Sequence, residues 1–211
     1  MDEIEKYIKI LKDRLLNDVT RNATIRGITM IAGTSAKIPI NVGDLIPDLL
    51  SLLSKNVRTL KLHTLECLNA LVNQYGSELK DKLGALLKEC ALFISEDDLQ
   101  LASFALDLAR RVYVLDSSLG ETNAVVQKTI ELAGSVVVEG QTQQRMCEFF
   151  RAFATNPAAK FEKTLEALEG QVSARNSCPA QCIATMLKQT GSVSVYVKRY
   201  VEMLGKVADE K

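Results

Sequence analysis

Hydrophobic residues recur at helical spacing along almost the whole chain. The segment 56–75 shows this most clearly, because its apolar residues form one wide stripe: Leu60, Leu65, Leu68, Leu71, Val72 and Tyr75. A repeat of 3.6 residues in the apolar positions is typical of an amphipathic α-helix. The same pattern predicts helices over 2–16, 20–32, 44–53, 56–75, 79–94, 98–114, 121–138, 141–154, 157–172, 178–189 and 194–208. We therefore expect an all-α fold without a sheet.

A turn recurs between these helices at a nearly constant interval. Five markers each lie where one apolar segment ends and another begins: Asp18, Asn56, Asp98, Gly140 and Asn176. The markers are 38, 42, 42 and 36 residues apart. A period of about 40 residues with two helices per unit is the signature of stacked helical hairpins of the HEAT or armadillo kind. The pattern predicts an α-solenoid of about five hairpins plus a terminal helix, which offers a binding surface rather than an enclosed active site.

One segment departs from the helical pattern. The run Val136–Val138 consists of β-branched residues, which on their own favour a strand. We assign this run to the end of a helix, because no partner strand is visible and the register of the repeats requires a helix there.

Neither end of the chain shows a polar capping unit, which solenoids need. We therefore expect residues 1–211 to be a single solenoid segment cut from a much longer array. The last predicted helix has an apolar face broader than one neighbouring helix covers, formed by Val193, Tyr196, Val197, Tyr200, Val201 and Leu204. Because exposed apolar patches tend to find partners, this face predicts self-association.

The charge balance argues against two classes of partner. Lys and Arg together number 26, as do Asp and Glu, so the formal net charge is zero. Nucleic-acid binding depends on phosphate contacts from a basic surface, and a membrane-surface helix also needs a basic face, so we expect neither partner.

The N-terminus is acidic and no apolar run reaches about 18 residues, which argues against a signal peptide and a membrane span. Five cysteines within helical patterns suggest reduced, buried thiols, and hence a cytoplasmic and nuclear location.

The residues that most often perform catalysis are scarce. His63 is the only histidine, and it lies on the polar side of its predicted helix, where we expect it to face solvent. Cys178 and Cys182 are four residues apart, but the chain has no C-x-x-C pair to complete a zinc site. No glycine-rich phosphate loop and no G-x-S-x-G motif occurs. The sequence thus predicts no enzyme activity, no metal and no cofactor.

A ladder of polar residues follows the second helix of each predicted hairpin. In a HEAT-like stack these second helices line the inner, concave face, where mixed charges can bind a partner helix. The alternative is a face that is merely solvated. The candidate partner contacts on this ladder are Arg26, His63, Glu66, Asp107, Arg110, Glu148, Arg151 and Lys188.

Three stretches resemble the central region of the cullin-associated, neddylation-dissociated proteins (the CAND family, of the TATA-binding-protein-interacting type). They are residues 24–34 (TIRGITMIAGT, followed by Lys37 and Ile38), residues 55–65 (KNVRTLKLHTL) and residues 92–98 (LFISEDD). The likeness runs from Tyr7 to Tyr113 and continues more weakly to Lys211. These stretches pack helices against one another and contain no catalytic motif. The likeness is therefore specific because it is long and keeps the register of the repeats.

The resemblance implies a HEAT solenoid that wraps an unmodified cullin with its RING partner. In that family, wrapping competes with substrate-receptor modules and with attachment of a ubiquitin-like modifier, and so promotes receptor exchange. It implies a non-catalytic scaffold segment that reaches the cullin–RING core through a longer parent protein. The principal family contacts lie toward the two ends of the full solenoid, so the resemblance assigns no contact residue here.

Two other functions stay open at this point. One is an unrelated HEAT-repeat adaptor, such as a transport receptor or a phosphatase scaffold, which flanking repeats of another family would indicate. The other is an enzyme with an unrecognised site, which a deep polar pocket with perturbed acids would indicate.

Overall fold

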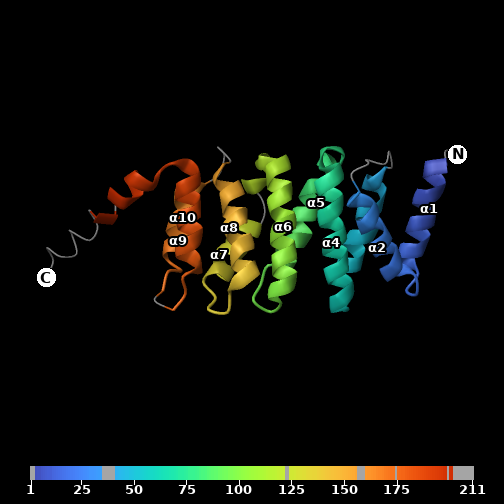
Figure 1. Cartoon of the computed structure of the whole chain (residues 1–211), viewed down its shortest axis with the longest axis horizontal. Helices are drawn as coiled ribbons and strands as arrows, with labels where there is room; N and C mark the ends of the chain where they lie inside the picture. The colour runs from blue at the N-terminus through green and yellow to red at the C-terminus, as the bar shows by residue number, and fades with distance from the viewer. Residues whose placement is uncertain are drawn as a thin grey trace.

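The computed structural model describes residues 3–34, 41–121, 124–155, 160–173, 175–198 and 200–201. Within these ranges all regular structure is helical, apart from one isolated β-bridge between Ser173 and Asn176. The helices stand side by side in one elongated row from the N-terminus to the C-terminus (Figure 1). The expected all-α solenoid is therefore confirmed.

The row has two layers, because each hairpin contributes one helix to each layer. The first layer consists of α1 (Glu3–Leu16), α3 (Ile46–Leu53), α5 (Leu83–Cys90), α7 (Val125–Ala133) and α9 (Phe161–Glu169). The second layer consists of α2 (Arg21–Ala32), α4 (Arg58–Tyr75), α6 (Leu99–Leu115), α8 (Gly140–Ala154) and α10 (Cys178–Thr190). Each helix contacts its partner within the hairpin and its neighbours in the same layer. The helices of the first and last hairpins, α1, α2, α9 and α10, have a neighbour of their own layer on one side only. In Figure 1 the ribbons of α6, α8 and α10 lie in front of those of α5, α7 and α9.

The predicted turn markers lie inside the hairpins, where the second helix of each follows the first, and Gly140 is itself the first residue of α8. In Figure 1 these turns follow the lower edge of the row. Short 3-10 helices extend several connections: η1 (Val42–Leu45), η2 (Gly76–Glu78), η3 (Lys80–Lys82), η4 (Ala91–Phe93) and η5 (Ser117–Glu121). Five hairpins, followed by helical backbone over 193–198 and 200–201, match the predicted number in the described part of the chain.

Several first-layer helices are shorter than the sequence pattern predicts. The helix expected over 79–94 is regular only in α5, because 3-10 turns flank it on both sides. The helix expected over 157–172 is regular only in α9, and residues 156–159 lie outside the described ranges. Most second-layer helices match their predicted bounds to within two residues, and α4 ends at Tyr75, directly before Gly76, as predicted.

The assignment of Val136–Val138 to a helix end is wrong. Helix α7 ends at Ala133, where the N–H of Gly134 donates to the carbonyl oxygens of Ile130 and Glu131. The three valines form the turn that leads to α8, with Val136 69% exposed and Val138 buried. β-Branched residues have modest helix propensity, so nothing local extends α7 past the glycine.

The core is continuous along the row. Its largest fully buried side chains lie in the first, second and fourth hairpins, and they include Leu15, Ile25, Leu49, Leu65, Leu68, Tyr75, Phe149 and Phe150. The third and fifth hairpins add Leu86, Leu106, Leu168 and Met186, all 0% exposed. Between α6 and α8 the ring of Tyr113 packs edge-on against Phe149, with centroids 5.4 Å apart. Apolar burial between successive hairpins is therefore the main contact along the whole stack.

Polar bonds between successive hairpins repeat with the period seen in the sequence. The joined residues lie 39 to 43 positions apart in five such pairs: Thr34–Gln74, Arg58–Asp98, Glu96–Ser135, Leu99–Thr142 and Ala133–Asn176. Each bond thus connects similar places in adjacent repeats, and the sequence period is also the spatial period.

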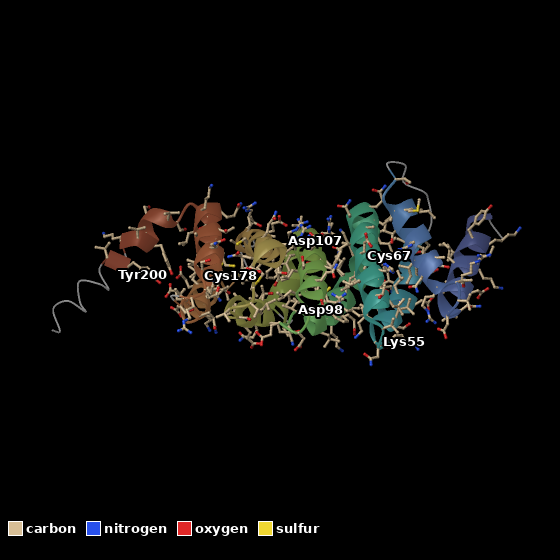
Figure 2. The ribbon with its side chains drawn as sticks, turned by 60° about the horizontal axis from the view of Figure 1, so that its bottom comes forward. Lys55, Cys67, Asp98, Asp107, Cys178 and Tyr200 are labelled. Carbon is tan, nitrogen blue, oxygen red and sulfur yellow. The ribbon has the colours of Figure 1, made fainter. Side chains whose placement is uncertain are left out.

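Asp98 performs two tasks at the start of α6. Its carboxylate accepts hydrogen bonds from the backbone N–H groups of Gln100 and Leu101, both at 3.1 Å, which caps the helix. It also accepts from the Arg58 guanidinium of the preceding hairpin, with Nη2 and Oδ1 3.0 Å apart. Figure 2 labels Asp98 together with Lys55, which lies in the turn before α4. The hydrogen bond from Arg58 lowers the pKa of Asp98, and the two backbone bonds act in the same direction.

The helical stretch after α10 has an exposed apolar side. Val193, Val197, Tyr200 and Val201 are between 37% and 63% exposed, whereas Tyr196 packs against the core. Tyr200 lies beyond α10 at the end of the row (Figure 2). The expected exposure is found for these residues, and Leu204 lies outside the described ranges. Self-association through this stretch stays a prediction.

We expect Leu68→Ala to lower the free energy of unfolding by about 2–5 kcal/mol, because it empties a packed core position. Leu68 is 0% exposed in α4. Leu16→Ala is the matched control: Leu16 is 64% exposed in α1, and its loss should change stability by less than about 0.5 kcal/mol. Urea denaturation measures both. Equal effects of the two substitutions would contradict the core assignment.

We expect Asp98→Ala to cost about 0.5–2 kcal/mol at neutral pH, mostly through the lost helix cap, since the Arg58 ion pair is largely exposed. Because the folded-state pKa of Asp98 lies below its unfolded value of about 3.9, its contribution is fully present above that pH. The contribution is lost as the pH falls through the folded-state pKa. Urea denaturation as a function of pH measures this, and the two proteins should converge in acid. Asp98→Asn, which can still cap, should lose less, and a pH-independent difference between Asp98→Ala and the parent would contradict the assignment.

Candidate functional site

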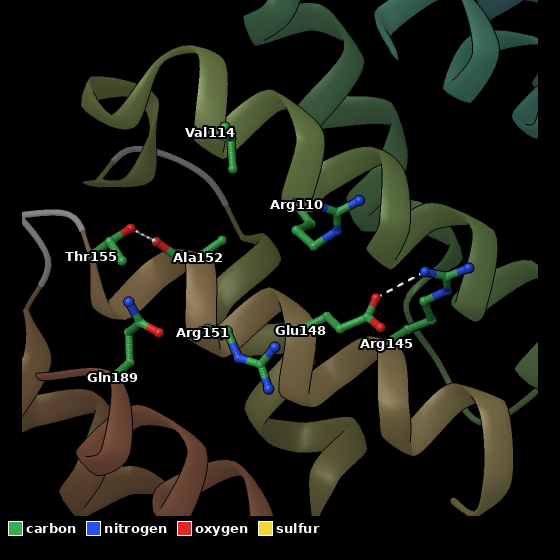
Figure 3. Close-up of a pocket in the computed structure, with 8 residues that line it drawn as sticks. All are labelled: Arg110, Val114, Arg145, Glu148, Arg151, Ala152, Thr155 and Gln189. Atoms are coloured by element: carbon green, nitrogen blue, oxygen red, sulfur yellow. Dashed lines mark hydrogen bonds and ion pairs between the residues drawn. The ribbon is translucent and has the colours of Figure 1, made fainter.

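The second layer contains a hollowed polar surface between its last three helices. Arg110 and Val114 of α6 face Arg145, Glu148, Arg151 and Ala152 of α8 across a hollow of about 530 Å3, which Thr155 and Gln189 complete (Figure 3). A second hollow of about 580 Å3 lies next to it, lined by Arg151, Ala184, Thr185, Lys188 and Gln189. The two share Arg151 and Gln189, so we treat them as one surface, the α6–α8–α10 groove.

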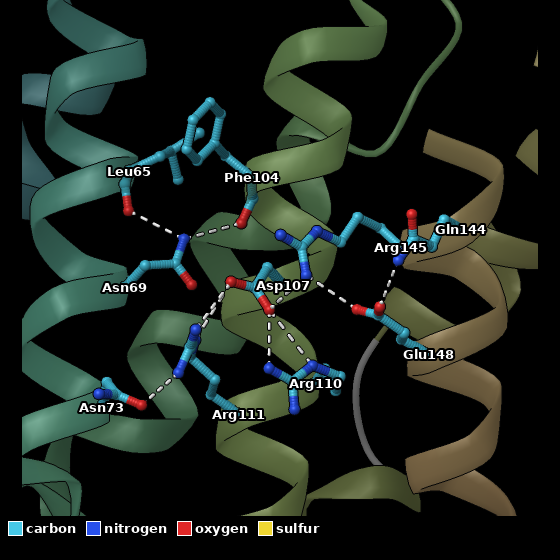
Figure 4. A network of polar contacts seen from close by, with 10 residues as sticks. All are labelled: Leu65, Asn69, Asn73, Phe104, Asp107, Arg110, Arg111, Gln144, Arg145 and Glu148. Carbon is cyan, nitrogen blue, oxygen red and sulfur yellow. Dashed lines mark hydrogen bonds and ion pairs between the residues drawn. The ribbon is translucent and has the colours of Figure 1, made fainter. Parts of the chain in front are cut away.

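A buried carboxylate organises the wall of this groove. Asp107 of α6 is only 7% exposed and is surrounded by three guanidinium groups (Figure 4). Its Oδ1 accepts from Nη2 of Arg110 at 2.8 Å and lies 3.5 Å from Nη1 of Arg145. Its Oδ2 accepts from Nη2 of Arg111 at 3.1 Å. Asp107 therefore links α6 to α8 and fixes the direction in which Arg110 and Arg145 point.

The charge of Asp107 is stabilised despite its burial. Burial alone raises the pKa of a carboxyl group, but the hydrogen bond from Arg110 and the positive charges of Arg111 and Arg145 outweigh it and lower the pKa of Asp107. A carboxylate kept ionised in this way stabilises packing, and it is a poor general acid or base near neutral pH. The lowered pKa of Asp107, beneath the polar groove, is therefore explained by its ion pairs within the protein.

The same network continues in both directions along the layer. On the α4 side, Arg111 donates to the side-chain oxygen of Asn73, and Asn69 Nδ2 donates to the carbonyl oxygens of Leu65 and Phe104, both at 3.0 Å. On the α8 side, Arg145 Nη1 lies 2.8 Å from Glu148 Oε2. These contacts link three second-layer helices through polar side chains (Figure 4).

The structure brings together half of the predicted contact residues. Arg110, Glu148, Arg151 and Lys188 line the α6–α8–α10 groove. Arg26 and Glu66 are exposed on α2 and α4, in the same layer but outside the groove. Whether any of these side chains contacts a partner stays a prediction.

Two predicted contacts lie deeper than expected. His63 does not simply face solvent: it is half-buried, and its Nδ1 atom has no hydrogen-bond partner among the described residues. Asp107 lies beneath the surface rather than on it. The reason is the same for both, since α4 and α6 are each flanked by two second-layer helices that cover their sides. On α4 only a narrow strip that contains Thr59, Glu66 and Asn73 stays exposed.

The sequence reasoning missed Arg111 and Arg145. Arg111 lies next to Arg110 of the polar ladder, and Arg145 lies three residues before Glu148. Their role depends on reaching Asp107, which no local pattern reveals. The concentration of arginines, at positions 110, 111, 145 and 151, was the available signal.

The thiols divide into two kinds. Cys67, Cys90, Cys178 and Cys182 are buried, as predicted, whereas Cys147 of α8 is only partly buried. Burial raises the pKa of Cys67 to about 12 and raises that of Cys90 as well. Within the described residues, no three His, Cys, Asp or Glu side chains are grouped as a metal site would require.

The sequence comparisons agree with this architecture. A protein of Drosophila melanogaster called cullin-associated NEDD8-dissociated protein 1 is 30% identical over 156 residues, which cover 72% of this chain and 12% of that protein. This chain is similar to part of the cullin-associated NEDD8-dissociated proteins. The Arabidopsis thaliana protein of the same name is 28% identical over 229 aligned residues, or 96% of this chain and 18% of that protein. Cullin-associated NEDD8-dissociated protein 2 of Mus musculus is 29% identical over 140 residues, which cover 65% of this chain and 11% of that protein.

The chain spans less than a fifth of the length of these three relatives. Among solved structures, an engineered protein superposes with a TM-score of 0.66 at 16% identity, over 98% of this chain and 89% of the engineered one, which supports the fold alone. No model of a known protein family matches the chain. None of the described helices is long and apolar enough to cross a lipid bilayer.

We expect Asp107→Ala to destabilise the protein by about 1–3 kcal/mol, because three partly buried guanidinium groups lose a shared acceptor and repel one another. Asp13→Ala, which removes an exposed aspartate of α1, is the control and should be near neutral. Urea denaturation at pH 7 measures both. An Asp107→Ala variant as stable as its parent would show that the network contributes nothing to folding.

Proposed function

We propose that this chain is a non-catalytic scaffold segment of a regulator that binds a cullin and promotes exchange of the substrate-receptor modules of cullin–RING ubiquitin ligases. The observation that carries the proposal is the similarity to cullin-associated NEDD8-dissociated proteins over 72% and 96% of the chain. A two-layer helical stack suits a scaffold, because it offers a long surface to a partner.

The second layer is the part of the surface that we propose for partner contact. Arg151 and Lys188 are exposed and line the α6–α8–α10 groove, and Arg110 and Arg145 add positive charge there. Glu148 lines the groove too, but the basic groups outnumber it. We propose that this groove faces an acidic part of the cullin–RING core, since complementary charge speeds association and selects the partner.

Neither nucleic acid nor a membrane is part of this proposal, because the whole chain has no net charge to favour either. We propose a cytoplasmic and nuclear location for the parent protein. Assignment to the TATA-binding-protein-interacting type of the family stays a prediction.

The second candidate function is an unrelated HEAT-repeat adaptor. The fold agrees equally well with it, because a likeness at 16% identity supports only the architecture. The two functions differ in the partner that the parent protein binds in a pull-down: a cullin for the first, and another protein for the adaptor.

A pull-down with the full parent protein tests the proposal. We expect the parent to retain an unmodified cullin with its RING partner and to lose it when the cullin is modified by its ubiquitin-like protein. This chain alone should bind weakly, because it provides only a fraction of the surface while association carries a fixed entropic cost. A parent that ignores every cullin would refute the proposal and favour the adaptor.

Charge reversal in the groove tests the proposed contact. We expect Arg151→Glu with Lys188→Glu to weaken cullin binding by the parent about tenfold or more, since each acidic replacement repels an acidic partner. The matched control, Lys9→Glu with Lys163→Glu, makes the same charge change on exposed first-layer positions of α1 and α9. Fluorescence anisotropy at constant salt measures both. Equal losses in the two double variants would remove the groove from the contact surface.

A further inference from the structure

Two sulfur atoms meet where α8 packs against α10. The Sγ atoms of Cys147 and Cys182 are 4.0 Å apart, although the residues are 35 positions apart in the chain. Cys182 is buried, whereas Cys147 is partly exposed next to the α6–α8–α10 groove. Cys147 is therefore the more accessible residue of the pair to an oxidant in solution, and the sulfur of Cys182 lies 4.0 Å from that of Cys147.

We propose that Cys147 and Cys182 are a redox-sensitive thiol pair, which peroxide converts into a disulfide bond between α8 and α10. The bond requires the sulfurs to approach from 4.0 Å to about 2.05 Å, the length of a disulfide bond. The inference concerns this chain alone and does not depend on the proposed cullin partner.

The surroundings make Cys147 the attacking sulfur. When Cys147 is ionised, the Cys182 thiol can donate a hydrogen bond to it, and this contact lowers the pKa of Cys147. Burial opposes the shift, Thr185 and the charge of Arg151 add to it, and the charge of Glu148 opposes it. Cys182 is the poorer acid, because its bonds with Cys147 and Cys178 and its burial raise its pKa. The thiolate is the reactive form of cysteine, so Cys147 should react first.

The reaction balances with hydrogen peroxide as the oxidant. The Cys147 thiolate attacks one peroxide oxygen, the O–O bond breaks, and the leaving hydroxide takes up a proton to form water. The resulting sulfenic acid is attacked by the Cys182 sulfur, its S–O bond breaks, and a second water forms with the Cys182 proton. Two thiols and one peroxide thus give one disulfide and two waters, and the thiols lose two electrons.

The other thiols provide internal controls. Cys67 and Cys90 are buried and their pKa values are raised, so both should resist peroxide and alkylation. Cys178 is buried with its Sγ 3.9 Å from Sδ of Met146, and it lies on the same helix as Cys182. The Cys178→Ala variant cannot form a bond between Cys178 and Cys182 within α10. It therefore shows whether Cys182 bonds to Cys147 instead.

The test treats the reduced, purified chain with hydrogen peroxide, blocks the remaining thiols with N-ethylmaleimide and maps the peptides by mass spectrometry. We expect the parent and Cys178→Ala to lose two hydrogen atoms and to give a peptide that joins Cys147 to Cys182, which dithiothreitol reverses. Cys147→Ala and Cys182→Ala should form no such link, and Cys182→Ala should accumulate a sulfenic acid at Cys147 that dimedone traps. A parent that keeps five free thiols, or a link between any other pair, would overturn the proposal.

A second readout does not require the disulfide to form. Iodoacetamide should label Cys147 at pH 7 several-fold faster than an ordinary thiol, since a lowered pKa increases the fraction of thiolate, which is the reactive form. Cys182→Ser, which can still donate a hydrogen bond, should keep the fast labelling, whereas Cys182→Ala should slow it and move its pH midpoint upward. Thermal melting of both variants verifies that each is folded. Equal labelling rates for Cys147 and Cys67 in the folded parent would refute the assigned reactivity.

Discussion

Each helical hairpin in this chain can bury its apolar faces only against the next hairpin. A single pair of helices leaves one side of each helix in water, so the stacking of neighbours supplies most of the apolar burial. This constraint explains why the core runs without a break from Leu15 to Met186. It also explains why the polar bonds between hairpins recur at the same period, since equivalent places in adjacent repeats must meet.

Close stacking also determines the chemistry of the polar face. A second-layer helix with neighbours on both sides exposes only a narrow strip, and polar residues beside that strip must find partners within the protein. Asp107 does so by binding three arginines, and Asn69 by donating to the carbonyl groups of two helices. Arg110, Arg111 and Arg145, which are partly exposed, are therefore held in place from below. A partner that binds there meets side chains that have already lost much of their freedom, which reduces the entropic cost of association.

The sequence predicts local features of this fold well, because they depend on neighbours within a few residues. The helical period, the turns near Asp98 and Asn176, and the end of α4 at Tyr75 all follow from local patterns. It predicts poorly what depends on adjacent helices. The burial of Asp107 and the partial burial of His63 arise from α4, α6 and α8 lying side by side. The repeat register predicts a helix end for the valines after α7, although they form a turn. The approach of Cys147 to Cys182 joins residues one repeat apart, and no spacing rule within either helix reveals it.

The short reach of the inter-hairpin bonds affects how the protein acquires its structure. The polar bonds between the described hairpins connect adjacent repeats only, as in Thr34–Gln74, Arg58–Asp98 and Leu99–Thr142. The contact order therefore stays low, and each loop that must close during folding is only about one repeat long. Folding can begin at any two neighbouring hairpins and spread outward one unit at a time. During synthesis, each hairpin can dock as soon as its successor leaves the ribosome, without waiting for the distant end of the chain.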